Sequence, residues 1–368
     1  MVLSVLIAGG GTGGHLYPGI AVAREILARV PDARVTFVGT AAGIEARVIP
    51  REGFTLDLIR SAGLKGKSLT SLVRGVALLP LSALDAAQVL SRRRPSVVIG
   101  VGGYSSGPVV ALAALRGIPT MLLEQNAMPG VTNRLLARVV KAAAVTYEES
   151  VPFFAGKAFV SGNPVRPEFF SASVEAQARG THDEHGTPRG AAGVLVFGGS
   201  QGAHAINMAM VAAAPGLAAA SARLAITHQT GERDLEMVRD GYRRAGLEAR
   251  VEPFLFAMDR EMKSADLVIC RAGATTLAEL TASGRPSILV PLPTATDDHQ
   301  RRNAEAMVRQ GAAEMLEQGE LTGERLAGSV LALAADAERR GRMSAAARRL
   351  ARPDAARVIV DRMLALAR

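Results

Sequence analysis

Three glycine-rich turns constrain the fold of this chain most strongly, because each follows an apolar run and precedes a helix-like pattern. They occupy residues 9–15, 102–108 and 198–203. A strand that ends in glycines and runs into a helix presents backbone N–H groups, and the positive end of a helix dipole, to whatever binds there. Glycine also allows a positive φ and the close approach of a ligand. Turns of this kind in both halves of the chain predict a protein built around phosphate-bearing ligands.

Short apolar runs alternate with helical patterns along the chain, which is typical of α/β folds with parallel sheets. We expect strands at residues 2–8, 34–38, 55–59, 97–101, 120–123, 143–146, 157–160, 194–197, 223–227, 250–253, 267–270, 287–290 and 313–316. Their richness in Val, Ile and Leu favours burial on both faces. The final stretch, residues 336–368, has a basic helical pattern that Pro353 should divide into two helices.

A length of 368 residues suits two domains of roughly 150 residues each. Residues 171–193 are polar and include His182 and His185, which we interpret as a solvated connector and not as metal ligands. We therefore expect an N-terminal domain at 1–163, joined by a C-terminal helix at about 350–368, and a second domain at 164–349. Each half begins with a strand and a glycine-rich turn. This resembles two doubly wound domains with ligands at the carboxyl ends of the strands.

Lys and Arg outnumber Asp and Glu by 43 to 34, which suits an anionic partner. Nucleic acid is disfavoured, because aromatic residues make up only 4% and no basic–aromatic stripe is evident. The single cysteine, Cys270, lies in an apolar run and reads as an inert core residue, with neither a disulfide nor a zinc cluster available. The first apolar run lacks a preceding Lys or Arg, and no run reaches about 20 apolar residues. These features predict a cytoplasmic protein without a membrane span.

Two glycine patterns come close to known nucleotide-binding motifs. Gly9, Gly11 and Gly14 match G-x-G-x-x-G, but the next expected strand ends at residues 37–40 without an acid for a ribose. A nicotinamide cofactor is therefore disfavoured. Residues 63–68 nearly match a P-loop but lack its first glycine, and we interpret them as a basic surface loop.

Three further features suggest chemistry, each with a plainer alternative. His15 closes the first turn and could take a proton from a hydroxyl near pH 7, or could simply cap or pack the helix. Residues 274–276 begin a helix whose N–H groups could hold a diphosphate. Glu279 could hold a ribose diol there, or could cap its own helix. Residues 297–303 combine acids and amides that suit sugar hydroxyls, as a solvated helix start also would.

Taken in order, these motifs resemble the MurG family of bacterial glycosyltransferases. The matching segments are residues 10–15 with Pro18 and Gly19, 102–104, 124–126, 162–166, 198–203, 271–279 and 298–303. The resemblance covers nearly the whole chain and implies a GT-B fold, with two Rossmann-like doubly wound parallel-sheet domains facing a central cleft. One departure is His299-Gln300, where many relatives carry two glutamines.

The family's reaction would be an inverting transfer of N-acetylglucosamine from UDP-N-acetylglucosamine (UDP-GlcNAc). The acceptor would be the C4 hydroxyl of undecaprenyl-diphosphoryl-N-acetylmuramoyl-pentapeptide. This converts lipid I to lipid II, the last cytoplasmic step of peptidoglycan precursor synthesis. The C-terminal domain would hold the donor and the N-terminal domain the lipid-linked acceptor, with no cofactor and no metal.

The resemblance also assigns roles to individual residues. His15 would be the general base or contact the acceptor hydroxyl, with Glu124 in reserve. Donor-binding residues would be Thr12, Gly13, Gly14, Asn126, Arg166, Ser200, Leu255, Ala274, Thr275, Thr276, Leu277, Ala278, Glu279 and Gln300. Acceptor-binding residues would be Gly103, Tyr104 and Ser105.

The lipid acceptor gives a meaning to residues 64–95, which combine six cations with leucines and valines. Such a segment suits peripheral attachment to an anionic membrane surface on the cytoplasmic face, although an amphipathic core helix with a basic loop would look similar. Two other functions stay open. The chain could be another GT-B UDP-sugar transferase or a UDP-sugar epimerase, or it could be a non-catalytic nucleotide-sugar binding module.

Overall fold

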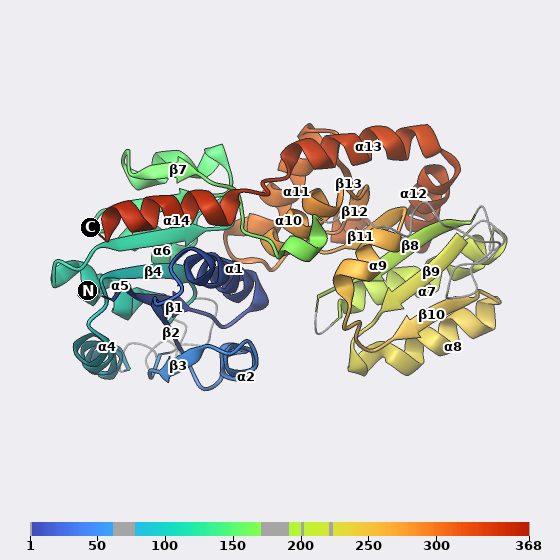
Figure 1. The fold of residues 1–368 in the computed structure, drawn as a ribbon. Coiled ribbons are helices and arrows are strands. Elements are labelled where there is room, and N and C mark those ends of the chain that lie inside the picture. The colour runs from blue at the N-terminus through green and yellow to red at the C-terminus, as the bar shows by residue number, and fades with distance from the viewer. Residues whose placement is uncertain (1, 62–77, 171–190, 200–201, 221–223, 368) are drawn as a thin grey trace. The chain divides into compact units, whose positions relative to one another are not determined.

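The computed structural model describes residues 2–61, 78–170, 191–199, 202–220 and 224–367. The chain divides into two units (Figure 1). Unit 1 comprises Met1–Arg166 and Arg352–Arg368, and unit 2 comprises Pro167–Ala351. The domain boundaries predicted from the sequence lie at 163/164 and at about 349/350.

Unit 1 is built on a parallel sheet of seven strands in the order β3-β2-β1-β4-β5-β6-β7. The strands are β1 (Ser4–Gly9), β2 (Arg34–Gly39), β3 (Thr55–Leu58), β4 (Val97–Gly102), β5 (Thr120–Glu124), β6 (Ala142–Val145) and β7 (Ala158–Val160). The strand order reverses between β1 and β4. In a doubly wound sheet, such a switch point is where ligands bind, beyond the carboxyl ends of the strands.

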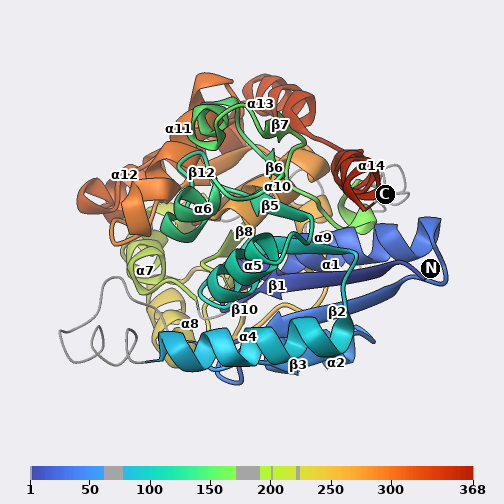
Figure 2. The ribbon, with the colours of Figure 1, turned by 90° about the vertical axis from the view of Figure 1, so that its left-hand side faces the viewer.

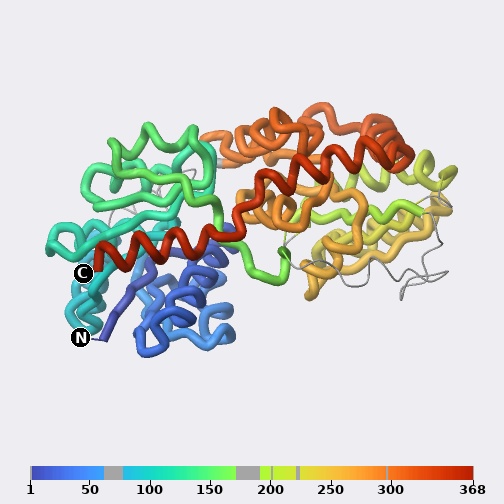
Figure 3. The backbone as a smooth tube through the Cα atoms, turned by 45° about the horizontal axis from the view of Figure 1, so that its top comes forward, coloured from blue at the N-terminus to red at the C-terminus, as the bar shows by residue number. Residues whose placement is uncertain are grey.

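Helices cover both faces of this sheet, because successive strand residues point to opposite sides. The helices are α1 (Gly13–Arg29), α2 (Glu45–Arg51), α4 (Leu79–Arg93), α5 (Ser106–Leu115), α6 (Val131–Leu136) and α14 (Ala355–Leu366), with the 3-10 helix η1 (Glu148–Phe154). Ile7 of β1 packs in a core with α1 and α14, whereas its neighbour Leu6 packs in a core with α4 and α5. Figure 3 shows α14 in red, returning from unit 2 to lie on unit 1.

Unit 2 repeats this plan with a parallel sheet in the order β10-β9-β8-β11-β12-β13. Its strands are β8 (Ala192–Phe197), β9 (Leu224–Gln229), β10 (Ala249–Glu252), β11 (Leu267–Cys270), β12 (Ser287–Leu289) and β13 (Ala313–Met315). Its helices are α7 (His204–Ala218), α8 (Leu235–Ala245), α9 (Met258–Ser264), α10 (Ala274–Ser283), α11 (His299–Arg309), α12 (Gly323–Ala335) and α13 (Ala337–Leu350). Short 3-10 helices lie at η2 (Pro167–Phe169), η5 (Glu232–Asp234), η6 (Thr296–Asp298) and η7 (Gln318–Glu320). The order reverses here between β8 and β11.

The predicted alternation of strands and helices is confirmed. Every expected strand forms, with ends within two residues of the prediction, and Pro353 lies between α13 and α14. Cys270 is fully buried in β11, where burial raises the pKa of its thiol. Within the described residues, no helix is both long and apolar enough to span a bilayer.

Candidate functional site

The first two glycine turns touch each other at the switch point of unit 1. The Gly10 N–H donates to the Gly102 carbonyl oxygen over 3.3 Å. Gly103 has a φ of +82°, and a Cβ there would overlap the Gly10 carbonyl oxygen. Residue 103 must therefore be glycine for two reasons, its positive φ and the direct contact between the backbones of the two loops.

His15 lies in the first turn of α1, directly beside the second glycine turn. Its ring packs so closely on Gly102 (φ +95°) that a Cβ there would lie 2.9 Å from His15 Nδ1. The same nitrogen lies 3.2 Å from Oε1 of Gln125, the residue after β5. The imidazole is half-buried and is held between two strand ends and its own helix.

Glu124, the alternative base, has its carboxylate engaged within its own loop. Its side chain is buried, and Oε1 accepts from the Asn126 backbone N–H at 3.0 Å and from Asn126 Nδ2 at 3.2 Å. Oε2 accepts from the Gly130 N–H and from Asn133 Nδ2, both at 2.9 Å. A buried carboxylate with four donors holds a loop in shape, and here it orients the amide of Asn126. The geometry favours His15 over Glu124 as a proton acceptor.

Glu45 is a site residue that the sequence analysis missed. Its carboxylate is 1% exposed and accepts from the Gly11 N–H at 2.7 Å. It also accepts from the Thr40 N–H at 2.9 Å and from Thr40 Oγ1 at 3.0 Å. The end of β2 lacks an acid in sequence, but α2 supplies one in space. The sequence hints at this role of Glu45 only through Gly39 and Gly43, because a Cβ on either glycine would collide with the Glu45 side chain.

This carboxylate changes what the first glycine turn can bind. The expectation that the turn offers its N–H groups to a ligand is wrong for Gly10 and Gly11, whose N–H groups are both used inside unit 1. A phosphate at the same place would also face the negative charge of Glu45. Thr12, which is exposed, and the half-buried Gly13 and Gly14 form the part of the turn that leads into α1.

The proposed acceptor residues differ in what they expose. The Tyr104 side chain is 51% exposed, and its carbonyl oxygen accepts from Ser61 Oγ at 3.0 Å. Ser105 is buried. Gly103 is engaged with the first turn, as described above, so Tyr104 is the member of this group whose side chain faces solvent.

The switch point of unit 2 joins the third glycine turn to the start of α10. Within the turn, the Gly202 N–H donates to the Gly199 carbonyl oxygen over 2.9 Å. Ser200 lies outside the described residues. Helix α10 begins at Ala274, as expected, directly after β11, which is the neighbour of β8 in the sheet. Two strand–glycine–helix junctions thus lie side by side at carboxyl strand ends, the arrangement that suits a diphosphate.

The expected donor residues of α10 fall on different sides of the helix. Thr275, Thr276, Ala278 and Glu279 are half-buried, whereas Leu277 is buried in the core. Ala274 and the two threonines form the first turn, and Glu279 lies in the second. A negative charge at Glu279 contributes, after burial, to raising the pKa of the Cys270 thiol, so the carboxylate lies near the end of β11.

Gln229 at the end of β9 is a second residue that the sequence analysis missed. Its Nε2 donates to the Gly199 carbonyl oxygen at 2.9 Å, and its Oε1 accepts from the Leu255 N–H at 2.9 Å. The side chain therefore ties the third glycine turn to Leu255, one of the expected donor-binding residues. Leu255 itself is buried, whereas its sequence neighbours Phe254 and Phe256 are exposed, Phe256 to 93%.

The remaining donor candidates lie on other loops. Gln300 Oε1 accepts from the Leu292 N–H at 3.0 Å, which fixes the loop after β12. Asp297 and Asp298, just before α11, both have a φ of +55°, a strained conformation that is found more often at functional sites than elsewhere. The Arg166 guanidinium lies 5.8 Å from the ring centroid of Tyr17 on α1, within unit 1. Thr12, Gly13, Gly14, Asn126 and Arg166 belong to unit 1, and the other described donor candidates belong to unit 2.

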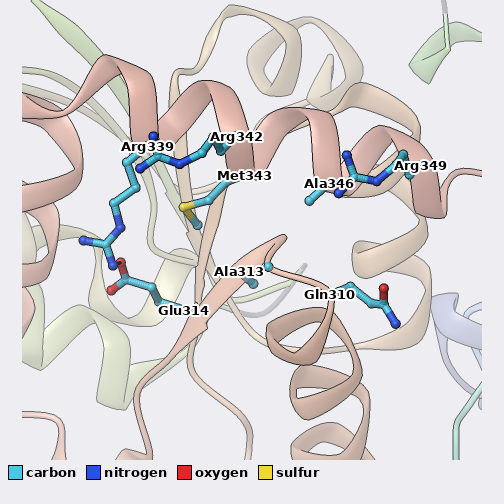
Figure 4. Close-up of a pocket in the computed structure, with 9 residues that line it drawn as sticks. Gln310, Ala313, Glu314, Arg339, Arg342, Met343, Ala346 and Arg349 are labelled. Carbon is cyan, nitrogen blue, oxygen red and sulfur yellow. Dashed lines mark ion pairs between the residues drawn. The ribbon is translucent and has the colours of Figure 1, made fainter.

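Unit 2 also has a cavity of about 430 Å³ at the amino end of β13 (Figure 4). It is lined by Arg339, Arg342 and Arg349 of α13, and Arg339 pairs with Glu314 at 2.6 Å. This position is at the opposite strand ends from the glycine turns. In the described part of the chain, no cluster of three or more His, Cys, Asp or Glu side chains is arranged to hold a metal ion. His182 and His185 fall outside that part.

Comparison with known proteins identifies the class to which this two-unit fold belongs. The model of the glycosyltransferase family 28 N-terminal domain matches residues 5–145, and that of the C-terminal domain matches residues 193–359. The chain is also 50% identical, over 98% of its length and 99% of the relative's, to a protein of Pelobacter propionicus. That relative is the UDP-N-acetylglucosamine–N-acetylmuramyl-(pentapeptide) pyrophosphoryl-undecaprenol N-acetylglucosamine transferase. The chain therefore belongs to glycosyltransferase family 28 and, within it, to the MurG group of N-acetylglucosamine transferases.

A solved structure of MurG agrees with this assignment. The crystal structure of Acinetobacter baumannii MurG superposes with a TM-score of 0.79 at 29% identity, covering 99% of each chain. A UDP-GlcNAc 2-epimerase from Neisseria meningitidis superposes with a TM-score of 0.69 at 13% identity, over 99% of this chain and 100% of that one. At that identity the epimerase shares the fold alone.

Proposed function

We propose that this chain transfers N-acetylglucosamine from UDP-GlcNAc to the C4 hydroxyl of undecaprenyl-diphosphoryl-N-acetylmuramoyl-pentapeptide, with inversion at the anomeric carbon. The observation that carries the proposal is the 50% identity to such a transferase, which extends over both units. The product would be lipid II, the completed precursor of peptidoglycan.

The donor belongs to the switch point of unit 2. The start of α10 and the third glycine turn supply N–H groups for the diphosphate, with Ser200 as a further donor. Glu279 accepts from the ribose hydroxyls, and the Leu255 carbonyl meets the uracil, since the Leu255 N–H is already given to Gln229. Positive helix ends stabilise the charge that develops on the UDP leaving group.

His15 removes the proton from the acceptor hydroxyl as that oxygen attacks the anomeric carbon. Four donors engage the Glu124 carboxylate, whereas among the described residues the His15 ring makes one polar contact, to Gln125. This difference in geometry supports His15 as the base. Replacing His15 with Ala should lower kcat by about 10²–10⁴-fold and leave UDP affinity nearly intact. If UDP affinity fell instead, His15 would be a donor-site residue.

We further propose that unit 1 attaches peripherally to the cytoplasmic face of the membrane. Residues 64–77 of the expected anchor lie outside the described residues, but α4 and α5 run side by side (Figure 2). Leu84 of α4 is 58% exposed and Leu115 of α5 is 81% exposed. Leu135 of α6, which packs beside α5, is 76% exposed, and exposed cations accompany these leucines at Arg116, Arg138 and Lys141. Leucines flanked by cations suit an anionic lipid surface.

Vesicle binding tests this attachment. Replacing both Leu84 and Leu115 with Glu should weaken binding to vesicles that contain anionic lipid, and should leave transfer to a short-chain, water-soluble acceptor unchanged. Unaltered sedimentation with the vesicles would remove these helices from the attachment surface.

The transfer reaction itself is the decisive experiment. Labelled N-acetylglucosamine should pass from UDP-GlcNAc to a short-chain analogue of the muramoyl-pentapeptide lipid, with EDTA present. An epimerase would instead change the donor sugar without an acceptor. A binding module would hold UDP-GlcNAc and release no labelled lipid. If product were absent with EDTA and returned when Mg²⁺ was added, the transfer would be confirmed and only the expectation of a metal-independent reaction would be contradicted.

Donor assignment is tested by replacing Glu279 with Ala. Loss of a charge-assisted hydrogen bond should weaken donor binding by about 1.5–3 kcal/mol, with a matching rise in KM for UDP-GlcNAc. The matched control is Glu324→Ala, which removes an exposed glutamate of the same unit from the first turn of α12. An unchanged donor KM in Glu279→Ala would rule out the ribose contact.

A further inference from the structure

We propose that Gln125 is a positioning residue that fixes His15 in the tautomer with its proton on Nδ1. The Nε2 atom then carries the lone pair that accepts the proton of the attacking hydroxyl. The tautomer follows from geometry alone, whereas the catalytic consequence rests on the proposed function.

The orientation of the Gln125 amide is set by β4. Gln125 is 2% exposed, and its Nε2 lies 3.2 Å from the carbonyl oxygen of Val101. A carbonyl can only accept a hydrogen bond, so the NH₂ group of the amide must face Val101. The amide oxygen therefore faces the opposite way, where it lies 3.2 Å from His15 Nδ1.

This orientation decides which nitrogen of His15 carries the proton. An amide oxygen is an acceptor, so the nitrogen facing it must donate, and the neutral ring has one donor and one acceptor. The donor is Nδ1, and Nε2 is left with the lone pair. A neutral imidazole in water prefers its proton on Nε2, so the Val101–Gln125–His15 chain reverses the ordinary preference.

The surroundings of the His15 ring also hold it in place. The His15 ring rests against Gly102, where a Cβ would lie 2.9 Å from Nδ1 and displace it. Gln125 meets the ring through a neutral amide, so it orients the ring by hydrogen bonding. The neighbouring carboxylate, Glu124, is engaged by the backbone and amides of its own loop. The arrangement thus holds the ring in one orientation, with Nδ1 toward the Gln125 amide oxygen.

The direct test is ¹⁵N NMR of the histidine side chains in the intact protein, at a pH where His15 is neutral. The chain has six histidines, and His15→Gln identifies the signals of His15. We expect Nδ1 at the shift of a protonated ring nitrogen and Nε2 at that of an unprotonated one. In Gln125→Met, which keeps length and apolar volume but removes the amide, the pattern should move toward the Nε2–H form. A wild-type spectrum with the proton on Nε2 would overturn the inference.

Kinetics then test the consequence. Gln125→Met should lower kcat by about 10–100-fold, the usual effect of losing a partner that orients a functional histidine, with KM for UDP-GlcNAc within about twofold. Thr120→Val is the matched control: at the other end of β5, it removes a buried hydroxyl that has no hydrogen-bond partner among the described residues. Its spectrum and kcat should match those of wild type.

The outcomes separate this inference from the proposed function. A changed tautomer with an unchanged kcat in Gln125→Met would overturn the positioning role. An unchanged kcat in His15→Ala would refute the proposed base, while the NMR result would still decide the tautomer. An equal loss of kcat in Thr120→Val would trace the effect to general damage to β5 and overturn the specific role of Gln125.

Discussion

At the scale of single residues, buried polar side chains hold the glycine turns in place. Glu45 joins the β1 turn to the end of β2 by accepting from two backbone N–H groups and a hydroxyl. Gln125 and Gln229 do comparable work at β5 and β9, where each amide faces a backbone carbonyl on one side. The glycines allow the backbones of neighbouring loops to approach closely, and the hydrogen bonds of these three side chains fix the positions of the loops.

Replacing Glu45 with Ala should destabilise the protein by about 1–3 kcal/mol, because the Gly11 and Thr40 N–H groups lose their acceptor. The free energy of unfolding in urea measures the effect. The control is Glu148→Ala, an exposed glutamate of η1, which should change stability by less than about 0.5 kcal/mol. Equal stability of both variants would contradict the proposed role of Glu45.

At the scale of elements, a polar network joins β9 to α7 and α8 below the third glycine turn. Asn207 Nδ2 of α7 donates to the Thr230 carbonyl at 2.9 Å and to Asp234 at 2.8 Å. The Asn207 oxygen therefore faces His228 Nε2, 3.1 Å away, and His228 Nδ1 lies 2.7 Å from the Tyr242 hydroxyl. His228 is fully buried, and this burial lowers its pKa from 6.5 to about 3. The network thus contains a histidine that stays neutral in the folded protein.

This histidine predicts a loss of stability in acid. As the pH falls from 6.5 to about 3, His228 takes up a proton in the unfolded chain but not in the folded one. The free energy of unfolding should therefore fall by up to about 1.4 kcal/mol per pH unit in this window, and not above it. His228→Gln should remove that contribution. Urea unfolding of both proteins between pH 4.5 and 8 measures the difference, and parallel pH curves would contradict the prediction.

The sequence predicts the strands well, but it does not predict the buried polar side chains that hold the turns between strands and helices. Strands such as β4 and β8 were predictable because a run of apolar residues between turns is a local pattern. Glu45, Gln125 and Gln229 were not predictable, because their partners lie 34, 110 and 26 residues away in the chain. His15 was found from its place at a glycine turn, but its tautomer depends on β4 and β5 and is visible only in the folded chain.

At the scale of the whole molecule, the chain leaves unit 1, forms unit 2 and then returns. Helix α14 lies on unit 1 beside α1, and Ile359, Val360 and Met363 are buried in the unit 1 core. Burying three such side chains contributes about 5–9 kcal/mol, which is comparable to the net stability of a domain. Unit 1 therefore depends on residues that follow unit 2 in the sequence.

Truncation after Ala351 tests this dependence. The shortened chain should lose the fold of unit 1, so that limited proteolysis digests residues 1–166 and spares unit 2. Asp361→Ala is the control, since it removes surface ion pairs of α14 with Arg29 and Arg357 and should leave the protease pattern unchanged. Equal resistance of unit 1 in the truncated and full chains would contradict the prediction.

The return of α14 also sets the order of events during synthesis. Chains usually fold domain by domain from the N-terminus as the ribosome makes them. Here unit 1 cannot complete its fold early, because the ribosome must add all of unit 2 before it reaches residues 355–366. At ordinary elongation rates this delays the folding of unit 1 by about 10–40 s. During that interval the face of the sheet that α14 will cover stays open on the nascent chain. All strands of unit 2 are therefore synthesised before α14 is available to complete the core of unit 1, although unit 2 comes second in the sequence.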